Sequence, residues 1–128
     1  MAKRKVIETR AAPTPVASYS QAIRSGKLVF CSGQIAIDPR TGALIEGGVE
    51  AQTRVVLDNL GAVLAEAGLN YRDVVKCGVF LTDLAEFSAF DAVYAEYFDR
   101  EPPARTTIGV SALPRGARVE VDAIARIR

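Results

Sequence analysis

The chain has 128 residues, the length of one domain, and we expect a single domain over residues 1–128. Sixteen lysines and arginines oppose fifteen aspartates and glutamates, so the formal charge of +1 gives no strong field for attracting nucleic acid or an anionic membrane. Histidine is absent, which excludes serine–histidine and cysteine–histidine catalysis and the usual imidazole metal sites. Any chemistry must therefore use arginine, carboxylates, hydroxyls, the two thiols or the backbone.

The first third of the chain is predicted to be rich in β-strands. Short β-favouring runs at Lys5–Thr9, Gln21–Arg24 and Lys27–Ser32 indicate three strands, and Ser25-Gly26 is typical of a hairpin turn between the last two. A second turn is expected at Asp38–Gly42.

The middle of the chain changes to a helical period. Apolar residues recur at steps of three and four from Val49 to Ala67, and Gly68 is placed to close that helix. A β-branched run predicts a strand over Val74–Leu81, and Asp83 is placed to cap a second helix from Leu84 to about Asp99. Two helices cannot cover both faces of a five- or six-stranded sheet. We therefore expect a two-layer α+β domain with both helices on one face, and the other face solvated or buried against another chain.

The chain ends with two expected strands, Arg105–Ala112 and Arg118–Ile127, around a Pro-Arg-Gly turn. If they pair as an antiparallel hairpin with both apolar sets facing the helices, cross-strand partners have numbers that sum to an odd value. That register places Arg105, Thr107 and Glu120 together on the helix-free face. These residues are either a solvated polar face or an anion site, in which Arg105 binds a carboxylate and Glu120 holds a water.

Both cysteines, Cys31 and Cys77, lie inside apolar runs and are expected to be buried, reduced thiols without a zinc or disulfide role. The basic N-terminus has no apolar stretch behind it, and no apolar run reaches the length of a membrane span. We therefore expect a cytoplasmic protein that does not enter a membrane.

The sequence resembles one known family from about Val6 to the C-terminus. The resemblance rests on CSGQI at Cys31–Ile35, on the DPRTG turn that follows, and above all on PPARTTIGVSALPRGARVEVDAIA at Pro102–Ala125. These motifs are similar to those of the RidA (YjgF) family of reactive-intermediate deaminases. The resemblance implies a chorismate-mutase-like fold and a homotrimer with three clefts between subunits. It also implies hydrolysis of 2-imino acids, such as 2-iminobutanoate and 2-iminopropanoate, to 2-oxo acids and ammonia, with neither a cofactor nor a metal.

The same resemblance assigns roles to five residues. Arg105 would pair with the substrate carboxylate, and Glu120 would position the hydrolytic water. Gly33 and Thr107 would present backbone groups to the ligand, and Tyr19 would line the cleft.

Four positions depart from the pattern of this family. Thr107 stands where imine-deaminating members typically carry cysteine, Thr106 where serine is frequent, Ser18 where proline is usual, and Asp91 where asparagine is common. These departures leave the identity of the imine open. They also leave open a non-catalytic protein that binds small carboxylates or 2-oxo acids. RNA cleavage, ascribed to some relatives, is disfavoured by the near-zero net charge.

Overall fold

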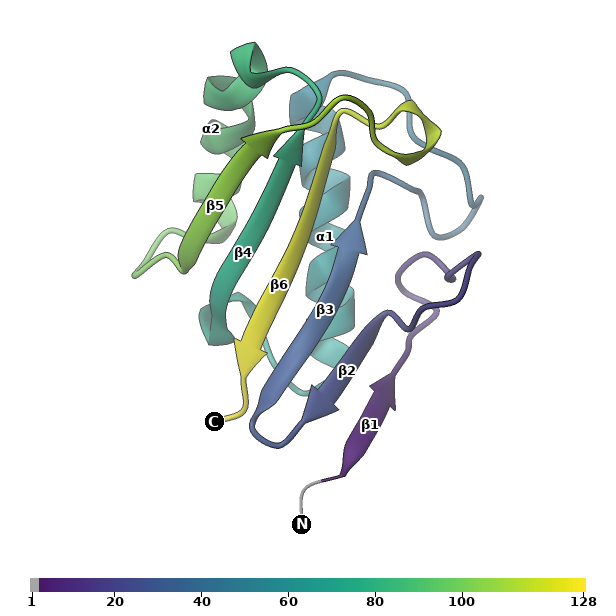
Figure 1. The fold of residues 1–128 in the computed structure, drawn as a ribbon, viewed down its shortest axis with the longest axis vertical. Coiled ribbons are helices and arrows are strands. Elements are labelled where there is room, and N and C mark those ends of the chain that lie inside the picture. Colours follow the sequence, from purple (N-terminus) through teal and green to yellow (C-terminus); the bar gives the residue numbers. More distant parts are fainter. Residues whose placement is uncertain (1–2) are drawn as a thin grey trace.

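The computed structural model describes residues 3–128 as one mixed sheet with two α-helices. In chain order the elements are β1 (Arg4–Ile7), β2 (Ala22–Ser25), β3 (Leu28–Gln34), α1 (Val49–Glu66), η1 (Tyr71–Asp73), β4 (Val74–Leu81), η2 (Leu84–Glu86), α2 (Phe87–Tyr97), β5 (Ala104–Gly109), η3 (Pro114–Gly116) and β6 (Val119–Arg126). The strand order in the six-stranded sheet is β1-β2-β3-β6-β4-β5. Both helices lie on one side of this sheet, which confirms the predicted two-layer α+β class (Figure 1).

The core lies between the helices and the sheet. Helix α1 buries Val56, Leu57, Leu60, Val63 and Leu64 completely, at the three- and four-residue steps read from the sequence. They pack with inward-facing residues of the central strands, including the two thiols, and both cysteines are free and buried. Within residues 3–128, no helix is both long and apolar enough to cross a membrane.

Local sequence signals placed most elements correctly. The β2–β3 hairpin turns at Gly26, whose φ is 62°, and α1 is closed by Gly68, whose φ is 77°. Glycine suits both positions because it adopts positive φ without a steric cost from Cβ. The Asp83 side chain accepts a hydrogen bond from the amide of Ala85, as predicted for a cap, but the first turn is a separate 3-10 helix, η2, and α2 begins at Phe87.

The predicted hairpin of the last two strands is wrong. Strand β5 pairs in parallel with β4, and β6 pairs antiparallel with the opposite side of β4, so that β4 separates them. Helix α2 is the reason: it carries the chain from the end of β4 back along the sheet, so the next strand runs parallel to β4 and becomes an edge strand. The chain then crosses over β4 to enter the sheet as β6 (Figure 1).

This topology also corrects the predicted shared face. Arg105 lies beside Cys77, which lies beside Ala123, and both of these neighbours are buried under the helices. Glu120 instead lies beside Phe80. Phe80 is an odd number of residues from Cys77 along β4, so Phe80 and Glu120 point to the helix-free face. Arg105, and Thr107 two residues further on, therefore face the helix layer, and Glu120 faces the opposite side. The alternation in β6 was predicted correctly, whereas that in β5 was inverted.

The helix-free face carries an apolar row across the sheet. Val6, Ile23, Phe30 and Ile124 are register partners from β1 to β6, and Val6 and Phe30 remain 49% and 43% exposed. Ile108, near the end of edge strand β5, is 45% exposed. Large apolar side chains that are aligned and half-exposed in this way are typical of a surface that another chain covers.

Candidate functional site

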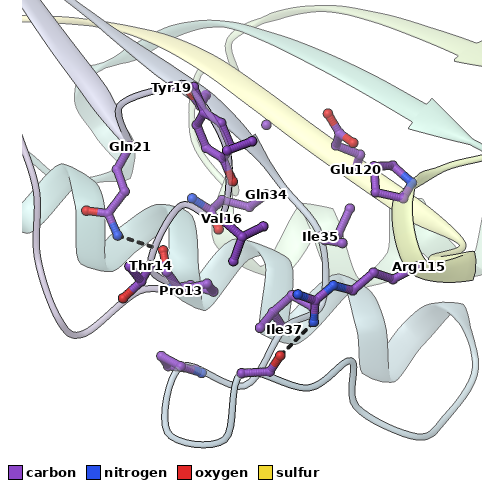
Figure 2. A pocket seen from close by; sticks show the side chains of 16 residues that line it. Pro13, Thr14, Val16, Tyr19, Gln21, Gln34, Ile35, Ile37, Arg115 and Glu120 are labelled. Carbon is purple, nitrogen blue, oxygen red and sulfur yellow. Dashed lines mark hydrogen bonds between the residues drawn. The ribbon is translucent and has the colours of Figure 1, made fainter.

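A cavity of about 580 Å³ opens beside the end of β3, a strand that β6 and β4 separate from β5. One wall is the Pro13–Gln21 loop, and the opposite wall is formed by Glu120 and the Pro114-Arg115 turn (Figure 2). The floor is mostly apolar, from Ile35 and Ile37. A cavity of this size with an apolar lining and a few polar groups is typical of a small-molecule site.

Glu120 and Gly33 come together in this cavity. The register between β3 and β6 shifts between Cys31 and Gln34, and this irregularity brings the backbone of Gly33 beside the Glu120 side chain. A methyl group added at Gly33 would overlap the carboxylate, with Glu120 Cδ at 2.8 Å. The φ of Gly33 is not in the positive range, so the carboxylate, rather than backbone conformation, requires glycine here.

The environment of Glu120 favours its protonated form. Burial raises the pKa of the carboxyl, and the negative charge of Asp122 raises it further. Asp122 lies two residues along β6 on the same face and is fixed there by a 2.8 Å hydrogen bond from the amide of Gly78. A carboxylate with a raised pKa in a cavity is a suitable general base, because it accepts a proton more readily than an exposed one.

Tyr19 lines the same cavity from the Pro13–Gln21 loop. Gln21, only 2% exposed, holds this loop in place. Its Oε1 accepts a 2.7 Å hydrogen bond from the amide of Thr9, and its Nε2 donates to the carbonyl of Pro13 at 2.8 Å (Figure 2). The sequence predicts a strand that begins at Gln21 and gives no signal for this role. A buried amide that bonds the backbone at Thr9 and at Pro13 has no local sequence signal.

Arg115 is a second residue of the cavity that the sequence does not predict. It lines the cavity, and its Nη1 donates a 2.6 Å hydrogen bond to the carbonyl of Gly42, which ties the Pro114-Arg115 turn to the Asp38–Gly42 turn (Figure 2). Its backbone has φ 59°, a left-handed conformation that is uncommon outside glycine. The sequence Leu113–Gly116 predicts a turn, but it does not predict the hydrogen bond from Arg115 to Gly42.

Arg105 and Thr107 lie outside this cavity. The guanidinium of Arg105 stacks among the aromatic rings of α2, and its Nη1 donates a 2.7 Å hydrogen bond to Asp91 Oδ1. Among the described residues, the buried Thr107 Oγ1 has no hydrogen-bond partner. Within one chain, three of the five predicted site residues thus lie together in the cavity: Tyr19, Gly33 and Glu120. The other two, Arg105 and Thr107, lie apart from them on the edge strand β5.

The thiols do not contribute a nucleophile to this cavity. Burial, together with the nearby Cys77 and Asp122, raises the pKa of Cys31 to about 12, so this thiol stays protonated at neutral pH. Burial also raises the pKa of Cys77. Within residues 3–128, no three acidic or cysteine side chains cluster as metal ligands would.

Comparison with known proteins identifies the family. The family model described as endoribonuclease L-PSP matches residues 9–127. The structure of RidA from the Antarctic bacterium Psychrobacter sp. superimposes with a TM-score of 0.93 at 41% identity, covering 96% of this chain and 99% of that one. The chain belongs to the RidA (YjgF, L-PSP) family.

Two further RidA relatives have informative descriptions. The 2-iminobutanoate/2-iminopropanoate deaminase of Mus musculus is 43% identical over 122 residues, which cover 95% of this chain and 90% of the mouse protein. A structure of E. coli TdcF with bound serine matches with a TM-score of 0.91 at 38% identity, covering 97% of this chain and 99% of TdcF. The family resemblance and the chorismate-mutase-like architecture expected from the sequence are therefore confirmed.

Proposed function

We propose that this protein hydrolyses 2-imino acids of the 2-iminobutanoate and 2-iminopropanoate type to 2-oxo acids and ammonia. The single observation that carries the proposal is Glu120, a carboxylate of raised pKa, held against Gly33 in a cavity of about 580 Å³. The mouse deaminase, similar over 95% of this chain, supports the same chemistry. No cofactor is needed because an imine carbon is already electrophilic.

The reaction can be written with this chain's own groups. Glu120 takes one proton from a water whose oxygen bonds to C2 of the iminium form of the substrate, giving a tetrahedral carbinolamine. The proton then passes from Glu120 to the nitrogen, and the C2–N bond breaks as the hydroxyl oxygen forms the carbonyl. Glu120 accepts the hydroxyl proton and passes it to the released ammonia, which becomes ammonium. A zwitterionic 2-iminium acid and one water thus become a 2-oxo acid anion and one ammonium ion, which balances atoms and charge.

We further propose that the site is completed between subunits of a homotrimer. Arg105 and Thr107 lie on edge strand β5, whereas Glu120, Gly33 and Tyr19 lie at the cavity, so a neighbouring copy is needed to bring the two groups together. The apolar row Val6, Ile23, Phe30 and Ile124 gives the helix-free face a reason to associate. In the assembled cleft, Arg105 of one subunit binds the substrate carboxylate and Glu120 of the next activates water.

Mixed trimers test the shared site. Arg105→Ala and Glu120→Gln subunits should each be inactive when 2-iminobutanoate is generated in the assay by an amino-acid oxidase. If the two are unfolded together and refolded at equal amounts, random mixing restores both groups in about one quarter of the clefts. Activity returning to about this level supports the proposal. No recovery after mixed refolding contradicts the shared site, and a fully active Arg105→Ala protein contradicts the carboxylate anchor.

A second candidate is a protein that binds small carboxylates without turning them over. Thr107 and Asp91 favour it, because they stand where the pattern of imine-deaminating members has cysteine and asparagine. TdcF, whose structure contains serine, supports amino acids as useful probes of this site. Binding of 2-oxobutanoate that is lost in Arg105→Ala, with no acceleration of imine hydrolysis, would select this candidate.

We expect no role in RNA cleavage, because a net charge of +1 provides little attraction for the phosphate backbone. We also expect the protein to be located in the cytoplasm.

A further inference from the structure

The guanidinium of Arg105 is held by α2 without any ligand. It lies 4.7 Å from the ring centroid of Tyr94, 5.3 Å from that of Phe87 and 5.8 Å from that of Phe90. Asp91, on the same helix, accepts the hydrogen bond from Nη1 at 2.7 Å. Three aromatic faces and one carboxylate therefore fix the direction of the side chain.

Asp91 removes the net charge from this group and leaves most of its donors. The hydrogen bond to Asp91 uses one of the five N–H groups of the guanidinium, so a second carboxylate can bind at the others. The side chains of Arg105 and Asp91 are 23% and 43% exposed, so water only partly screens the pair. A ligand carboxylate that binds Arg105 must then also lie close to the negative charge of Asp91.

We propose that Asp91 sets the charge selectivity of the carboxylate site, weakening the binding of singly anionic 2-oxo acids relative to zwitterionic ligands. The inference rests on the proposed role of Arg105 as the carboxylate anchor. A 2-oxo acid has one negative charge and meets the full repulsion of Asp91. The iminium form of a 2-imino acid carries a positive nitrogen beside its carboxylate, which offsets much of that repulsion. Asp91 thereby favours the substrate over the product of the reaction and assists product release.

The effect arises from charge more than from position. Asparagine at residue 91 keeps an oxygen that accepts the hydrogen bond from Nη1, and the aromatic rings of α2 still hold the guanidinium. Two carboxylates about 6 Å apart across a guanidinium repel each other enough to change affinity about 3- to 10-fold at effective dielectric constants of about 80 to 40. The change for a zwitterion should stay below about 2-fold, because its two charges interact with Asp91 in opposite senses.

Two stable probes of different charge test this inference by calorimetry on the full chain. They are 2-oxobutanoate, an anion, and L-serine, a zwitterion. Asp91→Asn should tighten binding of 2-oxobutanoate about 3- to 10-fold, change that of L-serine by less than about 2-fold, and increase product inhibition during turnover. The gain should shrink in 0.5 M salt, since the charges are partly exposed. Asp91→Glu, which restores the charge, should behave like the natural protein.

Glu96→Gln is the matched control. Glu96 lies on the same helix and pairs with Arg54 at 2.9 Å, so this variant removes an equal charge without touching Arg105, and neither affinity should change. Equal changes for both probes in Asp91→Asn, or no change for 2-oxobutanoate, overturn the inference, as does a natural protein that binds neither probe. Arg105→Ala tests the proposed carboxylate anchor separately from the inference about Asp91. If it abolishes binding of both probes, the anchor stands whatever Asp91 does, and if it changes neither, the anchor and the inference fail together.

Discussion

Replacing Gly33 by alanine tests whether the cavity depends on the exact position of the Glu120 carboxylate. The new methyl group would stand 2.8 Å from Glu120 Cδ and 3.0 Å from Cγ, and the three nearest atoms all belong to this one side chain. To reach an ordinary contact of 3.4 Å, Cδ must retreat by at least 0.6 Å, and the oxygen that the methyl overlaps must move further. Displacement of a catalytic group by about 1 Å costs about 10²-fold in rate, so we expect kcat/KM for 2-iminobutanoate to fall by about that factor.

The same substitution should leave the fold intact. The backbone of Gly33 already has a conformation open to alanine, and removing glycine stabilises proteins by about 0.4–1 kcal/mol through the unfolded chain. That gain opposes the cost of moving one half-buried side chain. We therefore expect the free energy of unfolding to change by less than about 1 kcal/mol, measured by urea denaturation.

A double mutant separates this mechanism from general damage. If Gly33→Ala acts by moving the carboxylate, adding it to Glu120→Gln should cost less than about 2-fold in residual activity, because the affected group is already lost. Gly48→Ala is a suitable control, since its φ is −83° and nothing lies within 4 Å of the added methyl. The reasoning is refuted if Gly33→Ala is fully active, or if its loss persists undiminished in the Glu120→Gln background.

Three further changes have defined outcomes. Glu120→Gln should raise the melting temperature at pH 7. The pKa of Glu120 is raised in the folded protein, so the natural carboxyl destabilises the fold as the pH rises above the pKa of glutamate in the unfolded chain, about 4.3. The difference between the two proteins should therefore vanish below about pH 4. Asp122→Asn should shift the acid limb of kcat/KM to lower pH, since it removes the negative charge that helps to raise the pKa of Glu120. An unmoved limb would contradict that coupling. Phe30→Glu should yield monomers by sedimentation and abolish activity, as each interface loses about 1.5–3 kcal/mol of apolar burial. Ala95→Glu, on the exposed side of α2, should not dissociate the protein.

Much of the fold could be read from the sequence because it follows from local periodicity. The apolar steps of α1, the glycines at 26 and 68, and the β-branched run of β4 each specify an element through contacts within a few residues. The alternation in β6 was also sufficient to place Glu120 and Asp122 on the helix-free face. These signals determine which segments are helices and strands and which face of most segments is buried.

Through the family resemblance, the sequence also singled out Arg105, Thr107 and Glu120 in the C-terminal motif and Gly33 and Tyr19 before it. It predicted the wrong neighbours for the two strands that carry the first three, β5 and β6. Strand pairing depends on how helix α2 returns the chain, and no short-range pattern records that β4 lies between β5 and β6.

The face of β5 could not be deduced from alternation for a related reason. The prediction assumed that apolar residues face the helices, yet Ile108 lies half-exposed on the helix-free side and Arg105 packs on the aromatic rings of α2. Both choices are stable because a guanidinium stacks well on aromatic faces and because Ile108 lies beside Phe80 on the helix-free side. The sequence alone thus determined the elements, the family and the residue types available for chemistry. Tertiary structure decided that Glu120 and Arg105 of one chain lie on opposite faces of the sheet, because strand order and register decide which face each side chain occupies.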